Sequence, residues 1–143
     1  MAAYKVDISL RAQHPDDDLA ALIERVGIAP SQRWKKGDPR RTPKGKLLRG
    51  TRDDSYCSIP LQVARTSSLT EAVSDSLKVV RRVKKQLREI VASGGKVSIA
   101  VGWFCTGDAG TSLPSDLLAE LGRAGVALDL YLYFAASDSN EDD

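Results

Sequence analysis

The longest amphipathic stretch of the chain lies between residues 68 and 93, and it sets the scale of the fold. Ser68 and Glu71 have the capping-box spacing that begins a helix, and Gly94 and Gly95 supply its end. A helix of this length is on the order of 36 Å long, enough to cross a small sheet. Its apolar face consists of Val73, Leu77, Val80, Leu87 and Val91, with Ala72, Val83 and Ile90 beside them.

Segments in which apolar and polar residues alternate lie on both sides of this helix and predict strands. The alternation covers residues 4–11, 56–61, 97–103 and 126–134, and it is strongest in the last of these segments. Short strands are also expected around Trp34 and from Leu47 onward, whereas the conformation of residues 37–54 stays open.

Two shorter helices are predicted from their end signals. Pro15 and the aspartates at 16–18 are typical of a first helical turn, where the free N–H groups favour negative charge, and Gly27 stops this helix. The second helix begins near Pro114 and closes at Gly125. Its core face is predicted to be Leu117, Leu118 and Leu121.

The order of these elements, β-α-β-β-α-β-α-β, predicts an α+β fold. Strands with one apolar face and amphipathic helices favour an antiparallel or mixed sheet with the helices packed on one face. The first six elements match the split β-α-β arrangement of ferredoxin-like folds. We expect a single domain over residues 1–136, followed by a flexible acidic tail over 137–143.

The order of elements and turns also resembles a bacterial family known only as domain-of-unknown-function family 4279. The stretches that carry the resemblance lie at 22–30 (LIERVGIAP), 34–38, 97–104, 113–118 and 125–129. The resemblance implies no established activity. Proteins of this kind are sometimes suspected of being immunity proteins in bacterial toxin systems, so it implies a non-catalytic, immunity-like protein-interaction module.

Charge is nearly balanced over the 143 residues, at +2, but it is locally polarised. Residues 33–52 hold nine basic residues and the single acid Asp38. Such a segment could bind phosphate groups while Trp34 stacks on a base. This pattern predicts a nucleic-acid-binding domain as the alternative function. The candidate binding residues are Arg33, Trp34, Lys35, Lys36, Asp38, Arg40, Arg41 and Lys44. The cations of the long helix, Lys78, Arg81, Arg82 and Lys85, are interpreted as the solvated face that any amphipathic helix carries.

Catalytic patterns are sparse, which makes an enzyme the weakest of the three hypotheses. His14 is the only histidine and is interpreted as a cap or surface residue, and Asp16, Asp17 and Asp18 point in different directions on a helix. We expect no metal site and no cofactor. The loop of Gly107, Asp108 and Gly110 before a helix is a weak candidate for binding an anion through its backbone N–H groups.

Cellular context and partners follow from the same composition. The chain has no apolar run of signal-peptide or membrane-spanning length. Cys57 and Cys105 lack disulfide or zinc spacing and are expected to be buried thiols, so we expect a cytoplasmic protein. The expected partner is an unidentified protein, or alternatively a nucleic acid. An acidic protein would complement the charge of the basic segment. A homodimer through an exposed strand edge is a further expectation.

Overall fold

Seven strands and four helices make up the part of the chain that the structure, a computed structural model, describes: residues 5–61, 68–105 and 110–134. The elements are, in chain order, β1 (Lys5–His14), α1 (Ala20–Val26), β2 (Gln32–Trp34), β3 (Pro39–Arg41), β4 (Leu47–Thr51), β5 (Ser55–Pro60), α2 (Leu69–Arg82), α3 (Lys84–Ala92), β6 (Lys96–Cys105), α4 (Ser115–Arg123) and β7 (Val126–Phe134).

Five strands form one mixed sheet in the order β2-β5-β1-β6-β7. Every neighbouring pair is antiparallel except β6 and β7, which are parallel. That parallel pair follows from α4, because a helical crossover returns the chain to the same end of the sheet. β3 and β4 form a separate two-stranded sheet. The α+β class is therefore confirmed. Between α1 and α2 the chain has four strands, whereas two or three were predicted, and β3 is the one that the alternation did not predict.

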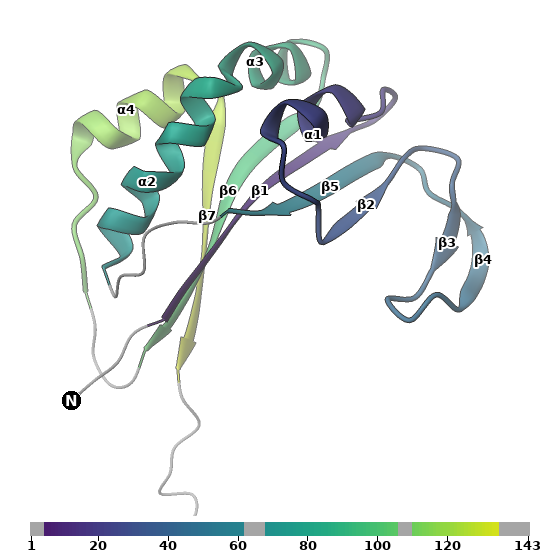
Figure 1. Ribbon diagram of the computed structural model, residues 1–143, viewed down its shortest axis with the longest axis horizontal. Helices are drawn as coiled ribbons and strands as arrows, with labels where there is room; N and C mark the ends of the chain where they lie inside the picture. Colours follow the sequence, from purple (N-terminus) through teal and green to yellow (C-terminus); the bar gives the residue numbers. More distant parts are fainter. Residues whose placement is uncertain (1–4, 62–67, 106–109, 135–143) are drawn as a thin grey trace, which may run out of the picture.

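The hydrophobic core lies between the sheet and the helices, and all four helices lie on one side of the sheet (Figure 1). Strand residues that point toward the helices, such as Leu10, Ile59 and Ile99, are fully buried. Val73 on α2 and Leu87 on α3 are equally buried and belong to the same cluster. Alternate residues of each strand consequently face away from the helices.

The single helix predicted over 68–93 is wrong, because the structure has two helices, α2 and α3, that meet at Val83. The backbone of Val83 leaves the helical range, with φ −110° and ψ 17°, while its side chain is fully buried. Beside the break, Arg82 Nη2 donates a 2.8 Å hydrogen bond to the carbonyl oxygen of Val26 on α1. Glycine and proline are absent there, so we attribute the bend to packing against α1 and the sheet. No helix within the described residues has the length and apolar composition needed to cross a membrane.

Several residues that the periodicity assigned to apolar faces are exposed instead. On the helices these are Val91, at 38% exposure, and Leu118, at 44%. On β7 only Val126 is buried, because β7 is an edge strand and its later residues extend past the helical cover. The exposed residues on the helix side of β7 are Leu130, Leu132 and Phe134.

The start of α1 and the environment of His14 also differ from the prediction. α1 begins at Ala20, so the aspartates at 16–18 precede the helix, and Asp18 Oδ1 accepts a hydrogen bond from the Ala20 N–H. His14 is buried, not a surface residue. Its Nδ1 accepts hydrogen bonds from the N–H groups of Asp16 and Asp17, at 3.0 and 2.8 Å. Because Nδ1 accepts, the ring proton lies on Nε2, which is 2.9 Å from Ser93 Oγ.

Replacing His14 is expected to destabilise the fold. His14→Ala leaves the two backbone N–H groups of the following turn without their acceptor, at a cost of about 1–3 kcal/mol in the free energy of unfolding. His14→Asn is expected to lose less, because its side-chain oxygen can accept in place of Nδ1. Urea unfolding measures both, with the exposed Lys85→Ala as a control. Equal losses for Ala and Asn would contradict this role.

Both cysteines are free and buried, as predicted. Burial within the sheet raises the pKa of the Cys57 thiol from its ordinary value near 9 to about 11, against smaller opposing effects of a backbone hydrogen bond with Ala12 and the charge of Arg33. The folded chain therefore keeps this thiol proton over a pH range in which the unfolded chain loses it.

This shift predicts a loss of stability at alkaline pH. The folded pKa is raised, so the contribution is fully present below about pH 9 and disappears as the pH rises toward 11. The expected loss is on the order of 2 kcal/mol. The measurement is the free energy of unfolding from pH 8 upward for the wild type and Cys57→Ala, in which this component is absent. Parallel pH profiles for the two proteins would show that ionisation of Cys57 does not cause the loss of stability.

Candidate functional site

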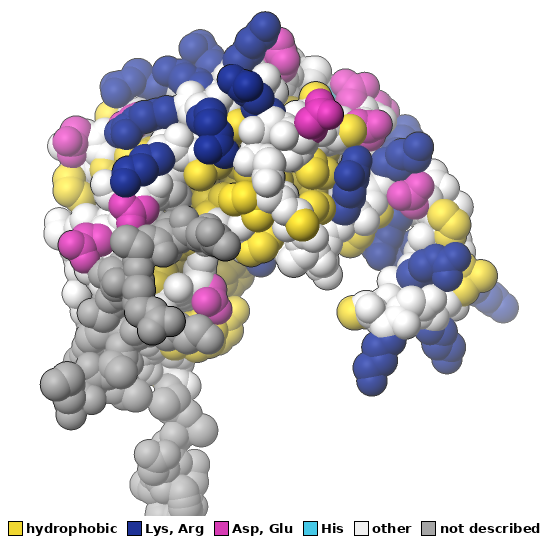
Figure 2. Space-filling model, viewed as in Figure 1, with side chains coloured by type: hydrophobic (Ala, Val, Ile, Leu, Met, Phe, Trp, Pro, Cys, Tyr) yellow, Lys and Arg dark blue, Asp and Glu magenta, His cyan; other side chains and the backbone are white. Residues whose placement is uncertain are grey.

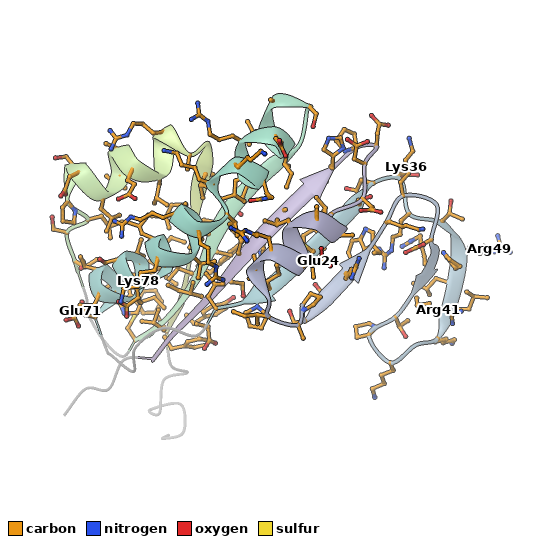
Figure 3. All side chains as sticks on the ribbon, turned by 45° about the horizontal axis from the view of Figure 1, so that its top comes forward. Glu24, Lys36, Arg41, Arg49, Glu71 and Lys78 are labelled. Atoms are coloured by element: carbon orange, nitrogen blue, oxygen red, sulfur yellow. The ribbon has the colours of Figure 1, made fainter. Side chains whose placement is uncertain are left out.

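The basic segment folds into a hairpin of β3 and β4 that extends from the body of the protein on the side away from the helices (Figure 1). All residues of both strands are exposed. The tip is a turn in which Gly45 has φ +91° and donates a 2.8 Å hydrogen bond to the carbonyl oxygen of Thr42. Lysine and arginine side chains line the hairpin in Figure 2. Arg41 and Arg49 lie on it in Figure 3, far from Lys78 on α2.

Trp34 attaches this hairpin to the sheet. Its ring stacks on Tyr56, with centroids 4.8 Å apart, and the guanidinium carbon of Arg52 lies 3.7 Å from the centroid of the indole. Its Nε1 donates a 3.3 Å hydrogen bond to Asp54 Oδ1, and Gln13 donates to the other oxygen of the same carboxylate. Trp34 therefore acts as an anchor for the hairpin, and its ring already has stacking partners.

Asp38, the single acid of the segment, organises the turn that leads into the hairpin. Its Oδ2 accepts a 2.9 Å hydrogen bond from the Lys35 N–H, and its carbonyl accepts one of 2.8 Å from the Arg52 N–H. Gly37, with φ +92°, donates to the Arg52 carbonyl oxygen in return. The carboxylate of Asp38 is thus engaged with the backbone, and the arginines nearby keep most of their positive charge uncompensated.

A cleft of about 570 Å³ lies between β2 and the hairpin, and we name it the basic cleft. Three arginines, Arg33, Arg41 and Arg52, are among the residues that line it. Hydroxyl and amide groups line it as well, which are further donors for an anion. The full lining is Ser31, Gln32, Arg33, Trp34, Asp38, Pro39, Arg41, Thr42, Pro43 and Arg52.

Four of the eight predicted binding residues line the basic cleft: Arg33, Trp34, Asp38 and Arg41. The other four lie around it. Lys36 Nζ forms a 3.0 Å ion pair with Asp16, and Arg40 Nη1 donates to the carbonyl oxygen of Arg49 on the partner strand of the hairpin. Lys35 lies in the turn before β3 and Lys44 in the turn at the hairpin tip.

Sequence reasoning did not single out Arg52, although it lay inside the basic segment. The β3–β4 pairing, Pro39 with Thr51, brings Arg52 beside the start of the hairpin, and this pairing was not predicted. The other proposed anion site is largely untested, because Gly107 and Asp108 lie outside the described residues. Gly110 is described and exposed. The acidic tail of 137–143 also lies outside them.

The second group of cations, on the helices, differs from the hairpin in the kind of partner. Arg41 and Arg52 donate to carbonyl oxygens of the hairpin, at Gly45 and Arg41, whereas two of the helix cations face carboxylates. Arg81 forms a two-pronged pair with Glu120 of α4, at 2.5 and 2.7 Å, and this hydrogen bonding lowers the pKa of Glu120. Arg82 donates to α1, and Lys78 lies 3.7 Å from Asp75. Three of the four cations assigned to a solvated helix face thus have protein partners. Within the described residues, no three His, Cys, Asp or Glu side chains gather as a metal site.

The attachment of the hairpin through Trp34 is testable. Trp34→Leu removes the contacts with Tyr56 and Arg52, which are worth about 1–2 kcal/mol together. The hairpin base is then expected to open more often, and amide exchange at Gly37 and Arg52 is expected to accelerate by about fivefold or more. Hydrogen exchange followed by NMR measures this, with Phe134→Leu as a control for loss of an exposed aromatic ring. Unchanged exchange at both amides would show that Trp34 does not hold the hairpin.

Comparisons with known proteins bear on the family of the chain. No match was found among curated proteins or among solved structures. The family model described as Domain of unknown function (DUF4279) matches residues 2–135, nearly the whole chain. This match confirms the resemblance drawn from the element order, and the chain belongs to the family Domain of unknown function (DUF4279).

Proposed function

We propose that the chain is a non-catalytic binding module that holds an anionic partner in the basic cleft. The observation that carries this proposal is the convergence of Arg33, Arg41 and Arg52 on one cleft whose single acid, Asp38, is engaged with the backbone. Clustered cations raise the local concentration of anionic partners and speed their association. The exposed cations along the hairpin extend the same positive surface beyond the cleft.

A binding role fits the positions of the groups that most often carry catalysis. His14 is buried and hydrogen-bonded to turn amides and Ser93, away from the basic cleft. Cys57 is buried with a raised pKa, so its thiol stays protonated at neutral pH and is a poor nucleophile. These placements favour a binding module over an enzyme.

The scaffold of this module is, we propose, a ferredoxin-like sheet with one added strand. Strands β2, β5, β1 and β6 are neighbours in this order and all antiparallel, which supports the split β-α-β arrangement expected from the sequence. β7 then extends the sheet through the crossover of α4. The addition makes β7 the edge strand opposite β2.

A protein partner at this β7 edge is the second candidate function. Nine residues of β7 carry one charge, Asp129, and from Leu130 to Phe134 each side chain is at least 42% exposed. A long, apolar edge strand is a surface that another protein, or a second copy of this chain, can extend by strand pairing. This edge supports a protein-interaction module, the class to which the immunity-like role belongs. The test is capture of a protein partner from nuclease-treated lysate by the wild type but not by Leu132→Lys.

The basic cleft is tested by binding of two labelled probes, an oligonucleotide and a polyglutamate peptide, measured by fluorescence anisotropy. Arg33→Ala combined with Arg41→Ala is expected to weaken binding about tenfold or more and to reduce its dependence on salt, because fewer counterions are displaced. The matched control, Lys78→Ala combined with Lys85→Ala, removes two exposed cations from the helices and is expected to bind as the wild type does. Equal losses in the two double variants would reject the cleft as the site.

A further inference from the structure

The face of the sheet away from the helices carries most of the exposed aromatic rings, and we name it the open face. Cys57, Val101 and Trp103 point into the core, so their strand neighbours Tyr56 and Phe104 point to the open face. The strand registers place Trp34 beside Tyr56, Tyr133 beside Phe104 and Tyr131 beside Gly102. The described helices cover the other side of the sheet (Figure 1).

Phe104, Tyr131 and Tyr133 form an exposed aromatic platform at the β6–β7 end of the open face. Their exposures are 36, 42 and 48%. Phe104 and Tyr133 stack with centroids 4.7 Å apart and planes 15° from parallel. Gly102 lets the Tyr133 ring lie close to β6, because a Cβ at this position would be 3.3 Å from Tyr133 Cε2. Rings at this exposure leave surface on which a planar group can stack.

Arg11 lies between this platform and the hairpin. Its Nη1 is 3.4 Å from the Tyr131 hydroxyl, and its guanidinium carbon lies 5.6 Å from the centroid of that ring. Its Nε is buried and has no hydrogen-bond partner among the described residues. Arg11 also lines a hollow of about 290 Å³ on the open face, together with Tyr56, Lys96 and Asp129.

Charge and aromatic surface are therefore divided between two neighbouring regions. The hairpin is strongly cationic, whereas the open face combines the cations Arg11 and Lys96 with the acids Asp7 and Asp129 and is nearly neutral. A polyphosphate backbone suits the first region, and uncharged planar bases suit the second. Five strands at about 4.8 Å spacing put β2 roughly 19 Å from β7, a span that a chain of several nucleotides can cross.

We propose that the anionic partner is a single-stranded nucleic acid, held by its phosphates at the basic cleft and hairpin and by bases stacked on Tyr131 and Tyr133. This proposal rests on the proposed function of the basic cleft. A duplex keeps its base faces stacked inside and cannot use the aromatic platform. An acidic protein would use the cations without needing the exposed rings. Arg11, which lines the hollow on the open face, supplies a positive charge along the path between the two regions.

The test is anisotropy with a labelled single-stranded oligonucleotide of about 15 nucleotides, and with the matching duplex, at low and raised salt. Tyr131→Leu and Tyr133→Leu are each expected to weaken single-strand binding by about fivefold or more, because each removes one stacking surface. Tyr133→Phe keeps the ring and is expected to bind normally. Phe134→Leu changes an exposed ring on the opposite face of the same strand and serves as the matched control.

The outcomes separate this inference from the function on which it rests. If Arg33→Ala with Arg41→Ala loses binding while both leucine variants bind as the wild type does, the basic cleft stands and the aromatic platform is overturned. If neither the oligonucleotide nor polyglutamate binds at all, the proposed function itself fails. If the duplex binds as tightly as the single strand, or if Tyr133→Leu only dissociates a homodimer seen by sedimentation, the single-strand proposal is likewise overturned. Circular dichroism checks that each variant folds.

Discussion

The placement of all four helices on one side of the sheet is the constraint from which the rest of the molecule follows. Burial of their apolar faces against β1, β5 and β6 supplies the one large core cluster, and apolar burial is the main favourable contribution to folding. The same placement leaves the opposite face of the sheet and the later residues of β7 without cover from the described helices (Figure 1). The surfaces available for binding are therefore those that are not buried in the hydrophobic core.

The hairpin depends on a second, smaller set of contacts. A two-stranded hairpin alone is marginally stable in water, and every residue of β3 and β4 is exposed. Its conformation therefore depends on the attachment at its base, where Arg52 and Tyr56 contact the ring of Trp34 and Asp54 accepts a hydrogen bond from it. This attachment explains how a segment with so many cations keeps a defined shape without an apolar interior of its own.

The two groups of cations illustrate why charge counts along a sequence are a weak guide to binding. Arg81 and Arg82 on α2 hydrogen-bond to α4 and α1, so their charge contributes to holding the helices together. Arg33, Arg41 and Arg52 instead converge on a cleft. Both groups look alike as runs of basic residues, and only the partners that the fold brings near them distinguish one from the other.

Local patterns determined much of the secondary structure. Alternation predicted β1, β5, β6 and β7, and the glycines at 27, 94 and 125 end helices with positive φ, as a residue without a Cβ can. The basic character of the candidate site was also evident in the sequence, since a strong excess of one charge needs no fold to be seen.

Tertiary structure decided the features that depend on distant partners. The bend at Val83 arises where α2 meets α1, and the burial of His14 depends on Ser93, 79 residues later. β7 has the alternation of a half-buried strand, yet it is exposed because of its place at the sheet edge. The pairing that brings Arg52 into the basic cleft is likewise set by the hairpin register. Periodicity in the sequence indicates which residues share one face of an element. Which neighbour covers that face is determined only by the tertiary structure.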